Sequence, residues 1–332
     1  MNAYSLPADS REQLRAAYAN VAAPSDDFQG ALVSLHRAFG ALPADLLHAI
    51  FAFGRDPASA GVMLIDGLPI DVALPDTPEL VAGERHGTIA HDAEKTLLGL
   101  AQLIGTPVGY LSEKDGNLIH HVVPMRGGEY TQSNRGSKVF LSYHNDSMYD
   151  PSLVFNSHNP DFLLLYCLRP DQQGEAATLY ADARKVVAEL TPAVRDVLRQ
   201  PRFQMAAPSN YTLLIAAAAD GEKVWSNPVP VLTGPLSYPE IYIAANGVEG
   251  LDDEAAAALE ALLAACQKVG EQQKVHLKPG QAMLINNRKG VHARTQFKPT
   301  YDGRDRWLLR ANIRTSLWTI RDRATDQALV FA

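Results

Sequence analysis

The spacing of hydrophobic residues divides the chain near residue 106. Before that point, apolar side chains recur every three or four residues, which predicts amphipathic helices at 10–21, 25–40, 42–54 and 91–105, with one short apolar strand at 61–70. From residue 106 onward, short apolar runs and alternating positions are typical of strands. Residues 1–105 are therefore expected to form a mostly helical flank, and residues 106–320 a β-rich core.

The β-rich part begins with two apolar runs around Asp115-Gly116, a dipeptide that favours a hairpin turn. Further strands are expected within 138–144, 161–170, 175–182, 223–234, 240–246, 274–297 and 305–316, and helices within 183–200 and 252–270. Many short strands with two inserted helices predict a β-sandwich or barrel against which the N-terminal helices pack. Because the chain contains no repeat and no linker, we expect one domain over residues 1–332.

Composition narrows the functional classes. The 332 residues are 46% hydrophobic and 20% charged, enough for a large core, and the net charge of -7 without a basic cluster argues against nucleic acid or a membrane surface as partner. The N-terminus lacks the pattern of a signal peptide, and no apolar run is long enough to span a bilayer. Cys167 and Cys266 lie in apolar surroundings typical of buried free thiols. These features favour a cytoplasmic protein, and they leave the oligomeric state open.

His144 and Asp146 stand two residues apart at the end of a predicted strand, where an imidazole and a carboxylate can bind one metal ion. Chance alone supplies about one such pair in this composition, so the alternative is a hydrogen-bonded histidine on a strand. His292 leads another short strand after a Pro279-Gly280 turn. Two nitrogens and one carboxylate on one face of a metal suit non-haem Fe(II) with a co-substrate and O2, whereas zinc would favour a further His or Cys.

Period-two alternation divides the predicted strand at 305–313 into two faces. Trp307, Leu309, Ala311 and Ile313 share one face, and Arg306, Leu308, Arg310 and Asn312 share the other. Arginines facing the inside of a barrel are costly unless they meet anions, such as a dicarboxylate co-substrate and a substrate carboxylate. The alternative is an edge strand with both arginines in water.

Five segments together resemble the clavaminate synthase-like Fe(II)/2-oxoglutarate oxygenases of the taurine dioxygenase-like group. They are HND (144–146), LLLYCLRPD (163–171), EAATLYAD (175–182), NNRKGVHAR (286–294) and YDGRDRWLLRANI (301–313), and the resemblance covers residues 61–320. It implies an α+β or mainly β fold with a double-stranded β-helix (jelly-roll) core flanked by N-terminal and inserted helices. It also implies Fe(II), 2-oxoglutarate and O2, and hydroxylation of an unactivated C–H bond in a free polar or basic amino acid, such as lysine, arginine, citrulline, asparagine or glutamine.

The resemblance also assigns roles to residues in the metal and co-substrate site. The iron ligands would be His144, Asp146 and His292. Arg306, fourteen residues after His292, would pair with the distal carboxylate of 2-oxoglutarate, and Thr178 would help to bind the same co-substrate. Arg310 would lie near the substrate carboxylate or the co-substrate.

Substrate residues follow from the same resemblance. Glu113 and Asn134 fall where amino-acid hydroxylases hold the α-amino and carboxylate groups, although Glu113 alone is also compatible with a turn acid in water. Asn246 stands where arginine hydroxylases carry an acid, which argues against arginine and leaves amide, ureido or ammonium side chains. Asp150 or Glu249 could still supply a negative charge.

Two further departures from the family pattern concern the metal motif and the segment after it. Many relatives have His-x-Glu where this chain has His144-x-Asp146, and the retained carboxylate argues against halogenation, while desaturation and epoxidation stay open. The following stretch, residues 147–160, is longer than usual and is a candidate lid.

Three other functions stay open at this stage. The first is an oxygenase that acts on a sulfonate or another small organic acid. The second is a metal-free β-barrel that binds a small acid through Arg306 and Arg310. The third is a cupin-like metal enzyme without 2-oxoglutarate, which gives Arg306 no role.

Overall fold

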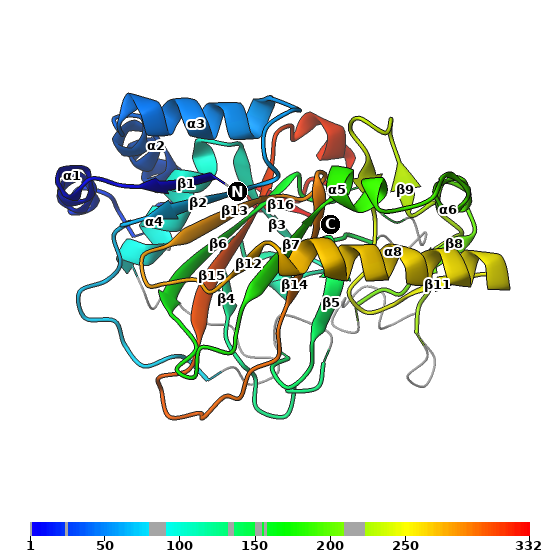
Figure 1. Cartoon of the computed structure of the whole chain (residues 1–332). Coiled ribbons are helices and arrows are strands. Elements are labelled where there is room, and N and C mark those ends of the chain that lie inside the picture. The colour runs from blue at the N-terminus through cyan, green and yellow to red at the C-terminus, as the bar shows by residue number, and fades with distance from the viewer. Residues whose placement is uncertain are drawn as a thin grey trace.

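Two β-sheets face each other, and helices cover the outer side of each (Figure 1). This arrangement is taken from a computed structural model, which describes residues 2–23, 26–79, 91–131, 136–149, 155, 158–208 and 223–332. The mixed sheets and the flanking helices give an α+β fold, in agreement with the class expected from the sequence.

The larger sheet runs in the order β1-β2-β13-β6-β15-β3-β16, and β4 also pairs with β15. Its strands are β1 (Asn2–Ser5), β2 (Val62–Asp66), β3 (Thr106–Tyr110), β4 (His120–Val122), β6 (Phe162–Arg169), β13 (Ala282–Asn286), β15 (Trp307–Arg314) and β16 (Val330–Phe331). The pairs β1–β2 and β3–β16 are parallel, and the other pairs are antiparallel.

The smaller sheet runs in the order β12-β7-β14-β5, with β5 (Leu141–His144), β7 (Thr178–Asp182), β12 (Lys274–Val275) and β14 (Gly290–Arg294). The chain passes from one sheet to the other between β5, β6 and β7, and again between β13, β14 and β15. Two short ladders pair β8 (Phe203–Met205) with β11 (Val248–Gly250), and β9 (Leu232–Thr233) with β10 (Glu240–Ile241). The strands expected at 223–234 and 240–246 are thus only two residues long where they pair.

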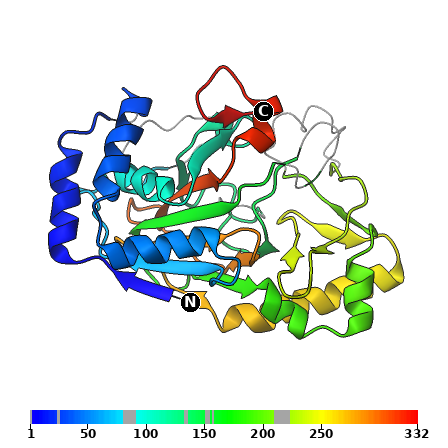
Figure 2. The same cartoon turned by 90° about the horizontal axis from the view of Figure 1, so that it is seen from above.

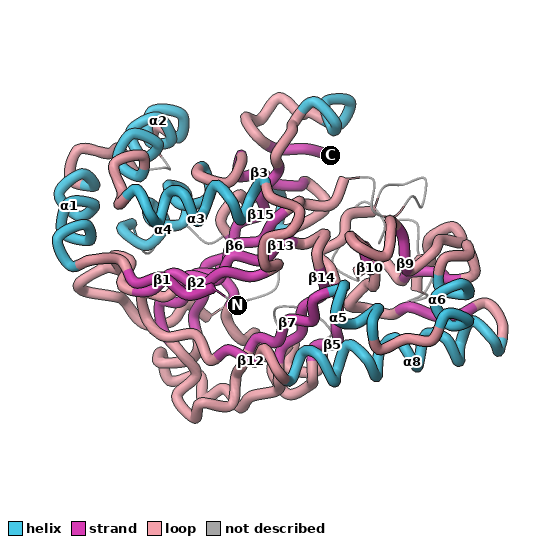
Figure 3. The backbone as a smooth tube through the Cα atoms, turned by 45° about the horizontal axis from the view of Figure 1, so that its top comes forward, coloured by secondary structure: helices cyan, strands magenta, loops and turns pink. Residues whose placement is uncertain are grey.

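Helices lie on both sides of the pair of sheets (Figures 2 and 3). On the side of the larger sheet are α1 (Ala8–Tyr18), α2 (Phe28–Phe39), α3 (Ala44–Arg55) and α4 (His91–Gln102), and on the side of the smaller sheet are α5 (Ala183–Ala188), α6 (Pro192–Leu198) and α8 (Asp253–Glu271). The helix expected at 183–200 is divided because Thr191 caps α6 and Pro192 occupies its first turn. Within the described residues, no helix combines the length and the apolar character needed to cross a membrane.

The alternation predicted for β15 is confirmed. Trp307, Leu309, Ala311 and Ile313 belong to the apolar cluster beneath α1–α4, whereas Leu308 belongs to the cluster between the two sheets. β15 is a central strand, with β6 on one side and β3 and β4 on the other. The alternative of an edge strand with solvated arginines is therefore wrong, because Arg306 and Arg310 are both buried.

The hairpin expected around Asp115-Gly116 is wrong. β3 and β4 do not pair with each other, and each instead pairs with a different part of β15. Between them lies the short 3-10 turn η1 (Lys114–Gly116), in which Lys114 and Asp115 have φ values of 53° and 56° and Gly116 has 78°. Three successive left-handed residues turn the chain so that both strands run along one edge of β15, and this loop carries Glu113.

Candidate active site

A pocket opens between the two sheets beside their shared apolar cluster. Its empty space, including the part that is open to solvent, is about 960 Å³. Val122, Leu165 and Leu308 belong both to the pocket lining and to the cluster between the sheets. Most of the polar lining residues come from β5, β7, β14, β15 and the loops next to them, so both sheets contribute to one site.

His144, Asp146 and His292 meet in this pocket, as the sequence predicted. His144 ends β5 and lies directly opposite His292 of β14 in the antiparallel register, so both imidazoles point to the same face. The Nε2 atoms of His144 and His292 each lie 3.7 Å from Asp146 Oδ1. One ligand atom from each residue lies within 4.8 Å of the others, which is an arrangement able to hold one metal ion.

A bulge in β5 orients His144. Between the pairs His292–His144 and Arg294–Leu141, one residue of β14 opposes two residues of β5, Ser142 and Tyr143. The carbonyl of Ser142 in this bulge lies 2.7 Å from His144 Nδ1, so Nδ1 carries the hydrogen and Nε2 keeps its lone pair. The bulge thereby directs a metal-binding nitrogen into the pocket.

Burial determines the protonation of the three groups. Burial lowers the pKa of His144 and lowers the pKa of His292 well below its usual value, so both imidazoles are neutral and can act as ligands. His292 Nδ1 finds no hydrogen-bond partner among the described residues. Burial also raises the pKa of Asp146, against the effect of Arg310. A divalent cation would favour the ionised carboxylate, so this donor set fits Fe(II).

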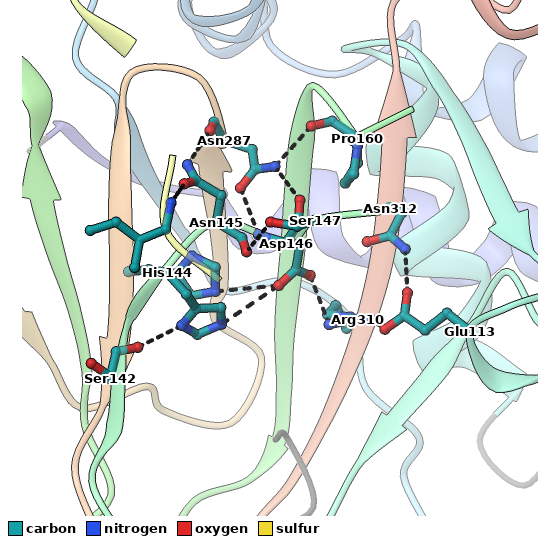
Figure 4. A network of polar contacts seen from close by, with 12 residues as sticks. Glu113, Ser142, His144, Asn145, Asp146, Ser147, Pro160, Asn287, Arg310 and Asn312 are labelled. Atoms are coloured by element: carbon teal, nitrogen blue, oxygen red, sulfur yellow. Dashed lines mark hydrogen bonds and ion pairs between the residues drawn. The ribbon is translucent and has the colours of Figure 1, made fainter. Parts of the chain in front are cut away.

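Two asparagines hold the segment that carries Asp146 against the β13–β14 turn (Figure 4). Asn145 Nδ2 donates to the carbonyls of Asn287 (2.8 Å) and Gly290 (3.2 Å), and its Oδ1 accepts from Ile243 N–H at 3.0 Å. Asn287 Oδ1 accepts from Asp146 N–H (3.1 Å), and its Nδ2 donates to the Asp146 carbonyl (2.9 Å). Neither residue was expected from the sequence to have a role, although they lie inside the HND and NNRKGVHAR segments.

Arg310 forms ion pairs with two acids at this end of the pocket. Its Nη1 lies 2.7 Å from Asp146 Oδ2, and its Nη2 donates to Glu113 Oε1. Asn312 Nδ2 donates to the other oxygen of Glu113 at 3.2 Å, as Figure 4 shows. Burial alone would raise the pKa of Glu113, but the charge and hydrogen bond of Arg310, together with His120 and Lys114, outweigh it and hold the pKa at about 2. The alternative of a turn acid in water is therefore wrong.

His120 is a third residue of the site that was not expected from the sequence. It lies directly opposite Arg310 in the β4–β15 register, with Nδ1 2.7 Å from Arg310 Nη2 and Nε2 2.7 Å from the carbonyl of Asn117. Because a carbonyl only accepts, Nε2 carries the hydrogen and Nδ1 accepts from Arg310. Burial lowers the pKa of His120 to about 3, which keeps the ring neutral. No sequence motif marks this residue, and only the strand register reveals it.

Arg306 and Arg294 form the other charged end of the pocket. Arg306 is 7% exposed and has no hydrogen bond or ion pair with any described residue. Arg294 lies opposite Thr178 in the β14–β7 register, and all three residues line the pocket. Burial lowers the pKa of Arg306, and burial together with nearby Arg306 lowers the pKa of Arg294 to about 9. Two buried cations and a hydroxyl here fit the carboxylate of a ligand.

Asn246 also lines the pocket. The Nδ2 of Asn246 donates to the Ala207 carbonyl at 3.3 Å, and Lys223 Nζ donates to the backbone carbonyl of Asn246 at 3.3 Å. Glu249 is exposed and binds Gln204, so the expectation that Glu249 could supply a charge to the site is wrong.

Two residues expected from the sequence to bind substrate cannot be compared with the structure. Asn134 and Asp150 lie outside the described residues. Of the candidate lid, Ser147, Met148 and Tyr149 line the pocket.

Comparisons with known proteins agree with this geometry. The family model described as "Taurine catabolism dioxygenase TauD, TfdA family" matches residues 43–312. L-asparagine oxygenase of Streptomyces coelicolor is 35% identical over 284 residues, covering 84% of this chain and 79% of that protein. Clavaminate synthase 2 of Streptomyces clavuligerus is 29% identical over 298 residues, covering 88% and 86%.

A solved structure is similar over the whole chain. Asparagine oxygenase in complex with Fe(II), 2S,3S-3-hydroxyasparagine and succinate has a TM-score of 0.86 and 31% identity, and the match covers 100% of this chain and 99% of that one. The non-haem iron oxygenase OrfP in complex with Fe and α-ketoglutaric acid has a TM-score of 0.77 at 24% identity, covering 97% of both chains, which is a likeness of fold.

Proposed function

The chain belongs to the taurine catabolism dioxygenase TauD/TfdA family, and on this basis we propose that it hydroxylates an unactivated C–H bond in a free polar or basic L-amino acid. It is a non-haem Fe(II)- and 2-oxoglutarate-dependent oxygenase. The reaction converts amino acid, 2-oxoglutarate and O2 into hydroxyamino acid, succinate and CO2. The observation that carries the proposal is one pocket with two neutral imidazoles, a carboxylate and an unpaired buried arginine.

His144, Asp146 and His292 hold Fe(II), supported by the convergence of Nε2 and Oδ1 atoms and by the neutral state of both rings. Bound Fe(II) with 2-oxoglutarate supplies the oxidising chemistry that O2 requires to attack a C–H bond. Arg306 and Thr178 hold the distal carboxylate of 2-oxoglutarate, because Arg306 is a buried cation that forms no ion pair with any described residue.

Glu113, Asn134 and Arg310 hold the α-amino and carboxylate groups of the substrate. Glu113 is ionised and buried, and it keeps lone pairs for an ammonium group beside its bonds to Arg310 and Asn312. Arg310 links this anchor to Asp146, which places the substrate's α-carbon region next to the metal. Asn134 is carried over from the sequence resemblance alone.

The pocket near Asn246 favours an uncharged or acidic side chain over a cationic one. Asn246 offers an amide oxygen and an N–H, and Lys223 places a positive charge beside its backbone. Among the described lining residues, the only acids are Glu113 and Asp146, and both already form ion pairs with Arg310. A guanidinium or ammonium group would therefore meet hydrogen-bond acceptors without a compensating charge.

A jelly-roll core follows from the same interpretation. The alternation of β5, β6 and β7, and of β13, β14 and β15, between the two sheets supports a double-stranded β-helix. α1–α4 share one apolar cluster with the larger sheet, which supports a single oxygenase domain over residues 1–332, with residues 1–105 as its flank.

A reducing compartment such as the cytoplasm suits the two cysteines. Cys167 and Cys266 are both buried and free. Burial raises the pKa of each thiol to about 12, so neither is a reactive thiolate at neutral pH.

A substrate panel tests the function. Fe(II), 2-oxoglutarate and O2 are supplied with each proteinogenic amino acid, citrulline, ornithine and taurine, and succinate and a one-oxygen mass gain are measured together. We expect one polar amino acid to give both signals, with asparagine, glutamine, citrulline or aspartate ahead of lysine and arginine. Oxidation of taurine alone would contradict the amino-acid assignment, and ligand binding without Fe(II) would favour a binding protein.

A further inference from the structure

Arg294 lines the pocket with Arg306 and Thr178, but the function proposed above gives it no role. It stands two positions after His292 on β14, so the two side chains share a face, and it is 5% exposed. In the strand register it lies opposite Thr178 of β7 and Leu141 of β5. It is thus a neighbour both of the metal-binding histidine and of the hydroxyl assigned to the co-substrate.

The hydrogen bonds of Arg294 go to neutral groups. Nη1 donates to the carbonyl of Gly136, and Nη2 donates to the carbonyl of Val139 at 3.2 Å. Nε is buried and has no partner among the described residues, and no described acid forms an ion pair with this guanidinium. Arg294 therefore remains a buried positive charge without a counter-charge in the described part of the chain.

Arg294 and Arg306 lie near the same aromatic ring. The Cζ atom of Arg294 is 5.3 Å from the centroid of the Phe297 ring, and that of Arg306 is 5.8 Å from it. The backbone of Phe297 is held by its N–H, which donates to the Ser137 carbonyl at 2.8 Å. One ring thus accommodates two buried cations, and the concentrated positive charge is costly unless an anion enters the pocket.

The two arginines differ in what they can do for that anion. Both Nη atoms of Arg294 are engaged by backbone carbonyls, so it cannot offer a bidentate fork to a carboxylate without losing them. Arg306 has no such bonds with the described residues, so it can offer both Nη atoms to a carboxylate. Arg294 can act through its charge alone, over a longer distance in a site that excludes much of the water.

We propose that Arg294 is a specificity residue for the co-substrate, whose fixed charge makes the pocket select a dicarboxylic 2-oxo acid over a monocarboxylic one. Arg306 makes the direct contact with the distal carboxylate, and Arg294 adds a second positive charge that only a dianion exploits fully. The inference deepens the proposed function on its co-substrate side, and it does not depend on which amino acid is hydroxylated.

A pair of matched ligands tests the proposal. 2-Oxopentanoate has the chain length of 2-oxoglutarate but carries a methyl group in place of the distal carboxylate. Both acids are titrated anaerobically into the Fe(II)-loaded enzyme by calorimetry, without any amino acid. We expect Arg294→Gln to weaken 2-oxoglutarate about tenfold or more and to change 2-oxopentanoate less than about twofold, because only the first ligand carries the second charge.

Two further variants separate charge from structure. Arg294→Lys keeps the charge but loses the bonds to Gly136 and Val139, so it should retain the preference for 2-oxoglutarate even where the protein is less stable. Arg304→Gln removes an equal charge from an exposed residue next to Asp302 and should leave both affinities unchanged. If Arg294→Gln fails to fold, the Lys variant still decides the question, because loss of its ligand preference would overturn the proposal.

The remaining outcomes are also decisive. Equal weakening of both acids by Arg294→Gln would assign Arg294 a structural role only and overturn the inference. A wild-type enzyme that binds the two acids equally would overturn it as well. Failure of every amino acid in the substrate panel, with normal 2-oxoglutarate titrations, would contradict the proposed substrate class and leave this inference intact.

Discussion

The two charged ends of the pocket differ in how their arginines are compensated. At one end, Arg310 has two carboxylates, from Asp146 and Glu113, and the neutral ring of His120 as acceptors within the chain. At the other end, Arg306 has no polar partner and Arg294 has only backbone carbonyls among the described residues. At the first end the arginine already forms ion pairs in the free protein, whereas at the second end the arginines form none with the described residues and can pair with an anionic ligand when one binds.

This difference separates two uses of a buried charge. A buried ion pair that is complete in the free protein orients its members, and removing one partner leaves the other uncompensated. A buried cation without an anion is unfavourable in the free protein, and the ligand that neutralises it gains affinity as a result. The Arg310 end should therefore matter for stability and geometry, and the Arg306 end for co-substrate binding.

The largest effect is expected at the point where the complete end meets the metal. Asp146→Ala removes one metal-binding oxygen and one partner of Arg310, so we expect no detectable hydroxylated product and weakened Fe(II) binding. The measurement is product and succinate by mass spectrometry, with calorimetric Fe(II) titration. Asp302→Ala, which removes an acid that is paired with exposed Arg304 outside the pocket, is the control. Full hydroxylation by the Asp146 variant would exclude the proposed metal site.

A pair of arginine variants tests the comparison itself. Arg310→Met leaves Glu113 and Asp146 buried without a counter-charge, which should lower the free energy of unfolding by about 3–5 kcal/mol. Arg306→Met removes a cation that has no partner, so the metal-free protein should lose less than about 1 kcal/mol or become more stable. Urea unfolding of both metal-free variants, without 2-oxoglutarate, measures the difference. Equal losses would show that the two ends are not distinct in this way.

Several residues that line the pocket could be picked out from the sequence, because some of their signals are local or periodic and the family resemblance supplied the others. The HND segment, His292 and the alternation from Arg306 to Asn312 each depend on short spacing, and strand geometry then fixes the direction of the side chains. The structure brings His144, Asp146, His292, Thr178, Arg306 and Arg310 into one pocket. Their chemical roles remain the proposals tested here.

The sequence failed where strand partners decide the outcome. Asp115-Gly116 favours a hairpin, but β3 and β4 both pair with the long strand β15, whose apolar face packs beneath the helices. His120 meets Arg310 only because this pairing sets the two residues opposite each other, and local spacing contains no trace of it. Arg294 lies inside a recognised motif, but nothing in the sequence was a reason to assign it a role. Only the structure shows that no described acid forms an ion pair with this buried cation.

The neutral ring of His120 makes the complete end sensitive to acid. Burial holds the folded-state pKa of His120 at about 3, below the value of about 6.5 expected in the unfolded chain. The unfolded chain therefore binds the extra proton first, so this contribution to stability is fully present above pH 6.5 and is lost as the pH falls toward 3. His120 therefore lowers the free energy of unfolding by about 1.4 kcal/mol for each pH unit that the pH falls within this window.

His120→Asn isolates that contribution because its amide oxygen can still accept from Arg310, while the side chain does not titrate. We expect the unfolding free energy of the metal-free variant to fall less steeply than that of the wild type between pH 6.5 and 4. Urea unfolding at several pH values gives the two slopes. His36→Asn, on the exposed side of α2, is the matched control and should keep the wild-type slope. Parallel curves for His120→Asn and the wild type would contradict the neutral, buried state of the ring.

The smallest effect is expected at Asn246, where the pocket wall carries no acid of its own. Asn246→Asp replaces an amide that both donates and accepts with a carboxylate that only accepts. The variant should therefore have a higher kcat/KM for substrates whose side chain donates hydrogen bonds, and a lower kcat/KM for substrates with a carboxylate side chain. The ratio of kcat/KM for asparagine to that for aspartate should rise about tenfold, which corresponds to about 1.4 kcal/mol. Competition between the two amino acids in one reaction measures this ratio directly. Glu249→Gln changes a charge three residues away but outside the pocket, and it should leave the ratio unaltered. An unchanged ratio in Asn246→Asp would mean that the substrate side chain points to another wall of the pocket, and the preference for uncharged or acidic side chains would then lose its basis.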